Sequence, residues 1–407
     1  MNGRTMPPPF FRPPPTGAGR IRITFSLLFS PDARAPVTTL RTWLRMGGWA
    51  LAAVFVAAFL VGYAAPFLSP VHFWWTNLVA VALPGLSVAV GGLAAGLCVW
   101  GAWRGRWGRG AVGAALLVLL AVRFGPRLAA WGPAPPPAES LRLMTFNVPP
   151  TFAGGGPDGT PLATLVRREA PHILALQESR VTTDRTGRGP VRRRSGSLEG
   201  VLAGSSGYGL ARRHPAATTI QQPVLGRLPL DSMSVHPLPP DGETSTRSRY
   251  TRTTFSWQGR PVVLYNLHLH SVGRARPWTL MPEEWTSPTR WATFLRTYRE
   301  GALRRAQQAR LLRRRLDRET RPVLVVGDFN STPHQWAYRH LAQGLQSSVT
   351  RRLPEWGGTF PARRPLVQID HVLAGPAWQV TAARIPGTAA QLSDHRPVVA
   401  HLRWKPR

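Results

Sequence analysis

Asp328 and Asn330 follow a run of aliphatic residues in the segment VLVVGDFNSTP, residues 323–333. Because side chains alternate along a β-strand, both are expected on one face, where a carboxylate and an amide would point at the same place. Gly327, directly before them, lets another part of the chain approach closely. This pattern indicates a site for a phosphate or a metal ion at the end of a buried strand.

Two other apolar runs end in side chains that carry oxygen. HILALQES, residues 172–179, leads into Glu178, and LRLMTFNV, residues 141–148, has Asn147 near its end. A carboxylate is a hard oxygen ligand of the kind that Mg²⁺ prefers. A single glutamate or asparagine in such a place is usually a solvated or turn residue, so the functional interpretation depends on these residues meeting.

The segment PVVLYNLHLHS, residues 261–271, contains two histidines. The period of a strand puts His268 and His270 on the same face, from which one or both can reach a phosphate. A lone histidine in a strand is more often structural.

Asp370, in QIDHVLAG, and the adjacent pair Asp394 and His395, in LSDHRPVVAHL, complete the set. An imidazole with an ordinary pKa of ~6.5 carries protons at neutral pH, and an aspartate beside it fixes its tautomer. Hydrolysis of a phosphoester needs charge neutralised on the phosphate oxygens, an aligned water and proton transfer. These residue types with Mg²⁺ or Mn²⁺ can supply all three.

The order and context of these residues resemble the endonuclease/exonuclease/phosphatase superfamily, which is DNase I-like, over about residues 140–405. The matching motifs are FN at 146–147, QE at 177–178, NLHL at 266–269, GDFN at 327–330, IDH at 369–371 and SDHRP at 393–397. The resemblance implies an α/β fold of four layers, a DNase I-like αββα sandwich in which helices cover two packed mixed sheets. It places the site at one end of the sheets.

The resemblance also implies a role for each matching residue. Glu178 is expected as the principal metal ligand, with Asn147 and Asp394 completing or shaping the metal site. Asp328 and Asn330 are expected to position the nucleophilic water and the phosphate.

Three further roles follow in the same way. His395 is expected as general base or phosphate contact, oriented by Asp370, and His268 is expected to stabilise the transition state or assist the leaving oxygen. Some members of the superfamily pair this last histidine with a further glutamate, whose counterpart the sequence does not identify. The resemblance leaves the number of metal ions, one or two, open.

The chain of 407 residues has 51 basic and 19 acidic residues, a formal net charge of +32, and arginine dominates. Arginine favours phosphate, although a general bias toward arginine would explain much of the excess. A basic segment from Arg180 to Arg194 follows Glu178 directly and is expected to overhang the site as a substrate-binding loop, with Arg180 closest.

We therefore expect a phosphodiesterase that acts on nucleic acid. The alternatives within the same chemistry are a phospholipid or sphingomyelin-type phosphodiesterase and an inositol-phosphate phosphatase. A non-enzymatic membrane binding protein on the same fold is the alternative of another class.

The N-terminal part differs in composition. Residues 1–45 are rich in arginine and proline and are expected to form a disordered basic tail, and residues 46–131 are strongly apolar. Spans are expected at about 46–68, 77–100 and 111–130. Arg123 and Arg127 interrupt the third, and an arginine at the centre of a span costs ~2.5–3.5 kcal/mol on insertion scales.

A proline-rich linker at 132–140 separates these spans from a catalytic domain at 141–407. Arg104, Arg106 and Arg109 follow the second span, and positive residues are retained in the cytoplasm. If the third segment spans, the catalytic domain emerges on the outer side of the membrane, and if it lies along the surface the domain stays inside. We favour a multi-pass protein of the cell membrane with the domain outside.

Overall fold

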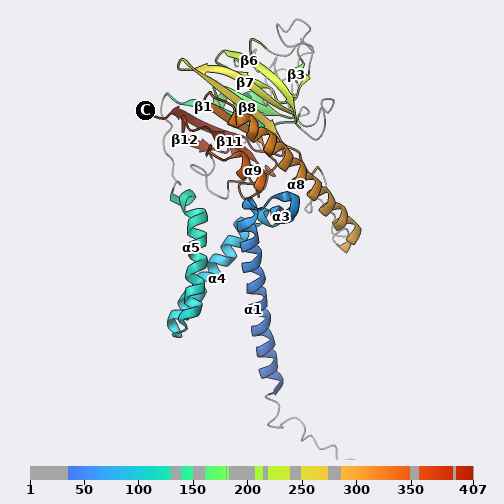
Figure 1. Cartoon of the computed structure of the whole chain (residues 1–407), viewed down its shortest axis with the longest axis vertical. Helices are drawn as coiled ribbons and strands as arrows, with labels where there is room; N and C mark the ends of the chain where they lie inside the picture. The colour runs from blue at the N-terminus through green and yellow to red at the C-terminus, as the bar shows by residue number, and fades with distance from the viewer. Residues whose placement is uncertain are drawn as a thin grey trace, which may run out of the picture. The chain divides into compact units, whose positions relative to one another are not determined.

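The structure of the chain is a computed structural model (Figure 1). It describes residues 35–129, 139–149, 161–179, 181–182, 207–213, 219–238, 249–273, 286–348, 357–387 and 391–406. The chain divides into two compact units, Met1–Ala53 and Val54–Arg407. Most of the expected tail and of the expected linker lie outside the described residues, as do Arg180 and the rest of the basic loop from residue 183 on.

Three helices are long and apolar enough to cross a membrane. They are α1 (Ala35–Ala64), α4 (Leu83–Trp103) and α5 (Trp107–Ala129). The apolar windows are Thr39–Phe67, Leu83–Trp103 and Trp107–Gly125. Because α1 begins at Ala35, residues 35–45 are helical and do not belong to the tail in which the composition placed them.

The second and third apolar helices begin elsewhere than the sequence predicted. Residues 65–82 form three short helices, η3 (Ala65–Phe67), α2 (Pro70–Phe73) and α3 (Thr76–Val81), before α4 starts at Leu83. Prolines stand in the first turns of η3, α2 and α4, where the missing N–H is tolerated and a new helix begins. Since α5 starts at Trp107, Arg123 lies near the end of its apolar window and not at the centre.

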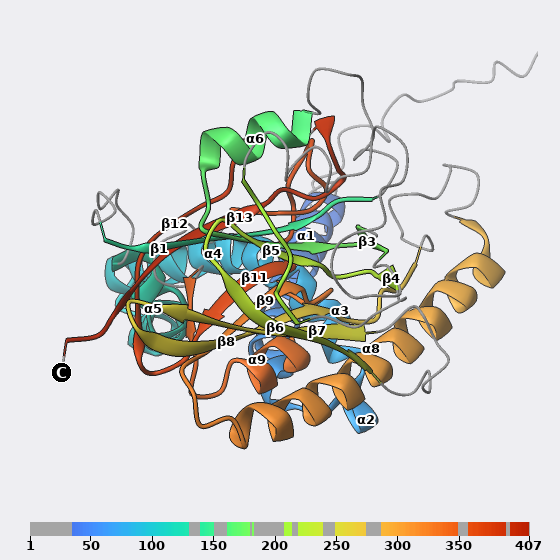
Figure 2. The same cartoon turned by 90° about the horizontal axis from the view of Figure 1, so that it is seen from above.

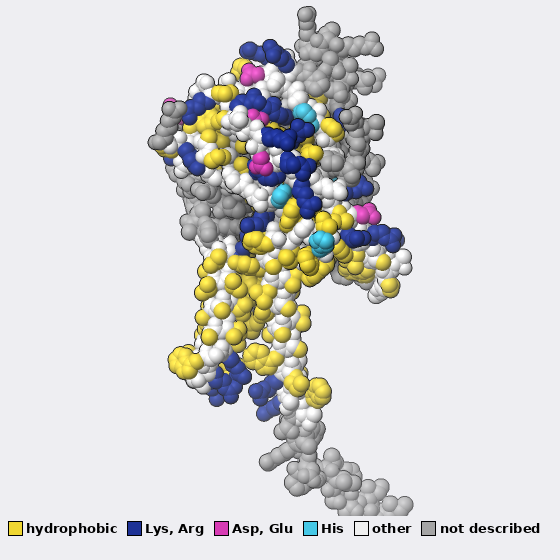
Figure 3. Space-filling model, in the orientation of Figure 1, with side chains coloured by type: hydrophobic (Ala, Val, Ile, Leu, Met, Phe, Trp, Pro, Cys, Tyr) yellow, Lys and Arg dark blue, Asp and Glu magenta, His cyan; other side chains and the backbone are white. Residues whose placement is uncertain are grey.

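Helices α4 and α5 pack closely through small residues. A Cβ atom added at Gly113 would come within 2.5 Å of the carbonyl oxygen of Ala94, and one at Gly101 within 2.7 Å of the nitrogen of Gly110. Glycine is therefore required at both contacts. Phe59, Leu83, Val90, Ala94 and Leu116 form the buried cluster that joins these two helices to the end of α1. Apolar side chains cover the outside of α4 and α5 (Figure 3).

The C-terminal part is built on two mixed sheets. The five-stranded sheet has the order β12-β13-β1-β2-β5, and the six-stranded sheet has the order β10-β11-β9-β8-β7-β6. The first consists of β12 (Trp378–Arg384), β13 (Val398–Trp404), β1 (Leu141–Asn147), β2 (Ile173–Gln177) and β5 (Val224–Gly226). The second consists of β10 (Gln346–Ser347), β11 (Asp370–Ala374), β9 (Val323–Asp328), β8 (Arg260–His268), β7 (Arg249–Trp257) and β6 (Leu230–Pro237). A short pair, β3 (Val181–Thr182) and β4 (Thr219–Ile220), is separate.

Helices cover the outer face of each sheet, which gives four layers (Figure 2). Helix α6 (Pro161–Glu169) packs on the five-stranded sheet, and α8 (Pro288–Asp317) and α9 (Trp336–Leu341) pack on the six-stranded sheet. The side chains of strand β1 alternate, because Leu141 and Leu143 enter the core between the sheets and Met144 and Phe146 face α6. The predicted DNase I-like α/β sandwich is confirmed.

Candidate active site

The polar residues expected to act together stand at the ends of two parallel strand pairs, one in each sheet. Asn147 is opposite Gln177 at the end of the β1–β2 pair, and His268 is opposite Asp328 at the end of the β8–β9 pair. Side chains that follow these strands therefore gather at one edge of the sandwich.

The backbone leaves both strand pairs in unusual conformations at this edge. Glu178, directly after β2, has φ 57°, and Asn330, two residues after β9, has φ 46°. The left-handed region is disfavoured for a glutamate by roughly 1–2 kcal/mol. Such conformations persist where the surrounding structure imposes them, and they cluster at functional sites.

Gly327 is required for close packing between β9 and β8. Its φ is 128°, and a Cβ atom there would lie 2.0 Å from the carbonyl oxygen of Leu267. No side chain fits this space. The close approach that the sequence indicated is therefore present, and it brings His268 beside Asp328.

The side chains of Asp328 and Asn330 lie together, but not on one face of a strand as the sequence predicted. Strand β9 ends at Asp328, and the chain then turns, so that the backbone N–H of Asn330 donates to Asp328 Oδ1 at 2.8 Å. Asn330 Nδ2 donates to Asp328 Oδ2 at 3.2 Å and to the carbonyl oxygen of Leu269 at 3.0 Å. The expected face was wrong because aspartate favours turns in which it accepts from the backbone two residues on.

Asn147, Glu178, His268 and Asp328 converge on one point. Asn147 Nδ2 lies 3.2 Å from Glu178 Oε1 and 3.0 Å from Asp328 Oδ2. The same two carboxylate oxygens each lie 3.7 Å from His268 Nε2. Among the described residues, these are the carboxylates that approach His268, so the separate glutamate of some superfamily members has no counterpart in this part of the chain.

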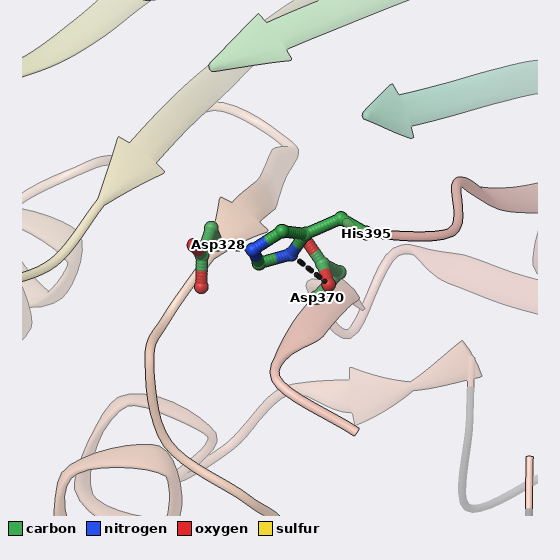
Figure 4. Close-up of side chains that lie close together, drawn as sticks. All are labelled: Asp328, Asp370 and His395. Atoms are coloured by element: carbon green, nitrogen blue, oxygen red, sulfur yellow. Dashed lines mark hydrogen bonds and ion pairs between the residues drawn. The ribbon is translucent and has the colours of Figure 1, made fainter. Parts of the chain in front are cut away.

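His395 and Asp370 form a buried pair beside this group (Figure 4). His395 Nδ1 lies 2.9 Å from Asp370 Oδ2, and His395 Nε2 lies 3.8 Å from Asp328 Oδ2. Burial alone would lower the pKa of His395, but the charges of Asp370, Asp328 and Asp394 outweigh burial and raise this pKa to about 10. The ring is therefore held by one carboxylate and directed at another.

Two hydroxyl residues that sequence reasoning did not identify hold this pair in place. Ser393 Oγ donates to the carbonyl oxygen of Asn147 at 2.7 Å and accepts from the backbone N–H of His395 at 3.1 Å. Thr359 Oγ1 accepts from the backbone N–H of Asp370 at 3.2 Å. Ser393 stands within the SDHRP motif, so its position was a usable signal, whereas Thr359 lies in a loop without any motif.

A buried polar network joins the two sheets beneath the site. Gln177 Nε2 donates to Thr145 Oγ1 at 2.9 Å and to Asn266 Oδ1 at 2.6 Å, and Asn266 Nδ2 donates to the carbonyl oxygen of Leu176 at 2.9 Å. Gln177 and Asn266 occur in the QE and NLHL motifs, and the structure gives them a positioning role. Together they fix β2 against β8, and hence Glu178 against His268.

Other expected site residues stand apart from this group. Asp394 is exposed and accepts weakly from Ser393 Oγ at 3.5 Å, and no hydrogen bond joins it to Glu178 or Asn147. His270 lies beyond the end of β8, and its carbonyl oxygen accepts from Arg305 Nη1 at 3.0 Å.

The side chains present suit a hard divalent cation. One carboxylate oxygen of Glu178 and one of Asp328 both accept from Asn147 Nδ2. Asn147 Oδ1 is buried with no hydrogen-bond partner among the described residues. Asp328, Asp370 and His395 also have ligand atoms within 4.8 Å of one another. Because Asp370 and His395 already bind each other, the oxygen atoms of Glu178, Asn147 and Asp328 are the better donor set for Mg²⁺.

Several solved structures are similar to this chain. A structure from Beutenbergia cavernae, described as endonuclease/exonuclease/phosphatase, matches 65% of this chain and 72% of its own, with 22% identity and a TM-score of 0.45. A mannosyl-6-phosphatase of Bacteroides thetaiotaomicron matches 65% of this chain and 100% of its own, with 15% identity and a TM-score of 0.43. The human Nocturnin catalytic domain with bound sulfate matches 66% and 96%, with 16% identity and a TM-score of 0.42.

No curated protein matches the chain significantly. The family model described as Endonuclease/Exonuclease/phosphatase family matches residues 144–395, a stretch that runs from β1 to His395 and includes the whole group of converging side chains. The chain belongs to the endonuclease/exonuclease/phosphatase family.

Proposed function

We propose that the protein is a membrane-anchored, divalent-metal-dependent phosphodiesterase. One observation carries the proposal: two carboxylates, an amide and two histidines from both sheets converge within hydrogen-bonding or ion-pair distance. This donor set can hold a hard cation and a phosphate side by side. The family consists of phosphoesterases, so the residues and the family point to the same chemistry.

Each side chain has a proposed part in the reaction. Glu178, Asn147 and Asp328 would hold Mg²⁺ or Mn²⁺, with Asp394 shaping the site, and the cation would neutralise charge on the phosphate oxygens. Asp328 and Asn330 orient the attacking water and the phosphate.

His395 takes the proton of that water while Asp370 holds the ring, and His268 stabilises charge on the phosphate or protonates the leaving oxygen. The pKa of His395 falls when positive charge is added beside Asp328 and Asp394, which brings it toward the range of a working base.

The proposal is tested with the purified full-length chain in detergent and bis(p-nitrophenyl) phosphate as substrate. We expect hydrolysis with Mg²⁺ or Mn²⁺, and its loss on addition of EDTA. Activity that persists after chelation would contradict a metal-dependent mechanism.

We also propose that the catalytic domain is extracytoplasmic. Arg104 and Arg106 lie between α4 and α5, Arg109 lies in the first turn of α5, and positive residues at such a connection stay in the cytoplasm. The other end of α5 and the segment that precedes α4 contact the C-terminal domain, since Arg123 of α5 binds His334 and Asn77 of α3 binds Gln335. A topology reporter fused after Arg407 should be extracytoplasmic. A cytoplasmic reporter would contradict the assignment.

The sequence favoured nucleic acid as substrate because of the basic loop from Arg180 to Arg194, whose arginines lie outside the described residues. Cleavage of plasmid DNA and of a phospholipid by the same preparation compares the two substrate classes directly.

A further inference from the structure

Residues 65–82, here called the juxtamembrane segment, have one apolar exposed face and one buried face. Phe67, Val71, Phe73 and Trp75 are between 43% and 58% exposed, although they are large apolar residues. Pro70, Thr76, Asn77 and Ala80 of the same segment are buried. Directly after a span that ends at Phe67, such a face suits the boundary between headgroups and acyl chains.

The buried face is hydrogen-bonded to the loop that follows β9. Gln335 Nε2 donates to the carbonyl oxygen of Asn77 at 2.8 Å, and the backbone N–H of Trp336 donates to Asn77 Oδ1 at 3.0 Å. Gln335 Oε1 in turn accepts from the backbone N–H of Thr332 at 2.8 Å. The loop between Asp328 and α9 is thus fixed to the membrane region as well as to the sheet.

Helix α5 contacts the same loop at a second point. Arg123 Nη2 lies 2.8 Å from His334 Nδ1 and 3.5 Å from the carbonyl oxygen of Pro333. Arg123 stands two residues before Gly125, where the apolar window of α5 ends.

Two further cations lie at the same boundary. Arg310 Nη2 donates to Ser69 Oγ at 3.1 Å, and the guanidinium of Arg339 lies 4.0 Å from the ring centroid of Phe67. Positive charge beside an interfacial segment favours the phosphates of lipid headgroups.

These contacts hold the loop that carries Asn330 beside the ends of the apolar helices. Two residues lie between Asn330 and Pro333, so three Cα-to-Cα steps separate them and their Cα atoms are at most about 11 Å apart. The headgroup region extends roughly 5–7 Å beyond the hydrocarbon on each side. A phosphate bound at Asn330 would therefore lie close to the end of the apolar window of α5, on the side where the headgroups begin.

From this placement we infer that the site acts on phosphodiesters carried by membrane lipids, an inference that rests on the proposed phosphodiesterase activity. The oxygen of water forms a new bond to phosphorus, the bond from phosphorus to one ester oxygen breaks, and the released alcohol takes up a proton. A soluble polymer such as nucleic acid needs no fixed distance to the bilayer, and a flexible tether would suffice for it. A lipid substrate does need the site to be held near the bilayer, and the contacts of the juxtamembrane segment hold it there.

The experiment uses the full-length chain reconstituted in vesicles of phosphatidylcholine and phosphatidylglycerol. Formation of diacylglycerol or phosphatidic acid from phosphatidylglycerol is compared with hydrolysis of bis(p-nitrophenyl) phosphate and of a DNA oligonucleotide. The double variant Phe73→Ser, Trp75→Ser removes apolar contacts of the exposed face. Leu366→Ser is the matched control, because Leu366 is 72% exposed and lies outside the juxtamembrane segment.

We expect the lipid to be cleaved in preference to DNA. The double variant should cleave it about tenfold more slowly, the change expected for loss of one well-buried apolar contact, and should hydrolyse the soluble diester at the normal rate. The control should match the unmodified protein on both substrates. Hydrolysis of the soluble diester without cleavage of the lipid, a preference for DNA, or an equal loss on both substrates in the double variant would each overturn the lipid inference. Absence of hydrolysis of every substrate would instead overturn the proposed phosphodiesterase function.

Discussion

Arg123 donates a hydrogen bond from Nη2 to His334 Nδ1, at 2.8 Å, and so joins an apolar helix to the loop after β9. A guanidinium group only donates, so the imidazole accepts at Nδ1 and has its proton on Nε2. The bond explains how an arginine is accommodated near the end of a span, because polar residues there pair with groups of the protein. It also makes the membrane region part of the structure that holds Asn330.

Gln335→Ala should weaken both stability and catalysis. The substitution leaves the Thr332 N–H, the Tyr298 hydroxyl and the Asn77 carbonyl without the partner they have now. Each buried group left unpaired costs about 1–3 kcal/mol. We expect a lower Tm in detergent and a lower kcat on the soluble diester. Gln343→Ala, at an exposed position just after α9, is the control and should change neither quantity.

His395→Ala should lower kcat by about 10²–10⁴, the usual contribution of general acid–base catalysis. Asp370→Asn should also lower kcat, and the double variant should lose little more than His395→Ala, because the two residues act as one unit. Rates on bis(p-nitrophenyl) phosphate test both statements. A near-normal kcat in His395→Ala would exclude this residue as the base.

The burial of Asp370 predicts that His395→Ala also lowers stability. The side chain of Asp370 is fully buried and would lose its imidazole partner in His395→Ala. An unpaired buried carboxyl is unfavourable, so a lower Tm should accompany the loss of activity. Asp370→Asn, whose amide is uncharged, should separate the two effects by retaining more of the Tm.

Glu178→Gln should weaken metal dependence before it affects folding. The side chain is 43% exposed, so its amide can be solvated, whereas an amide binds Mg²⁺ less strongly than a carboxylate does. The rate measured against Mg²⁺ concentration should show a higher half-saturation, with activity partly restored at high Mg²⁺. An unchanged metal response would remove Glu178 from the proposed ligand set.

His371 should make the fold less stable in acid. Burial lowers the pKa of His371 to about 4, and its Nε2 lies 2.8 Å from the carbonyl oxygen of Ser331. Below pH ~6.5 the unfolded chain binds a proton that the folded chain does not, so stability falls as the pH drops from about 6.5 to about 4 and then levels off. This pKa difference corresponds to a loss of roughly 3 kcal/mol in the free energy of unfolding.

Thermal unfolding in detergent at a series of pH values measures this loss. His371→Gln removes the titrating group and should flatten the curve over that range, although its Tm at neutral pH is expected to be lower. An equally steep curve in the variant would assign the acid sensitivity to other groups.

The sequence predicted the fold and most of the strand ends because burial leaves a local pattern. LRLMTFNV alternates, and VLVVGD is a continuous apolar run, so β1 and β9 could be placed by their residues alone. The turn at Asn330 could not be placed in this way, since two polar residues at the spacing of Asp328 and Asn330 fit both one face of a strand and a turn. The structure decides between them through the φ of Asn330.

The contacts with the membrane region were beyond sequence reasoning for another reason. Asn77 stands in an apolar context and was included in the second expected span, because nothing near it in the chain marks its partner. Gln335 carries no motif either. Hydrogen bonds between distant residues depend on how helices and sheets pack, and a single sequence records no such pairing.

The same pair of residues has a consequence for the order of assembly. Asn77 and Gln335 are separated by 258 positions, so Asn77 is synthesised long before its partner exists. During translation at roughly 5–20 residues per second, the apolar helices emerge first and the loop after β9 follows after most of the chain. Contacts between such distant residues form slowly because a long loop must close first. The loop after β9 therefore reaches its final position late, when the C-terminal domain closes onto the apolar helices.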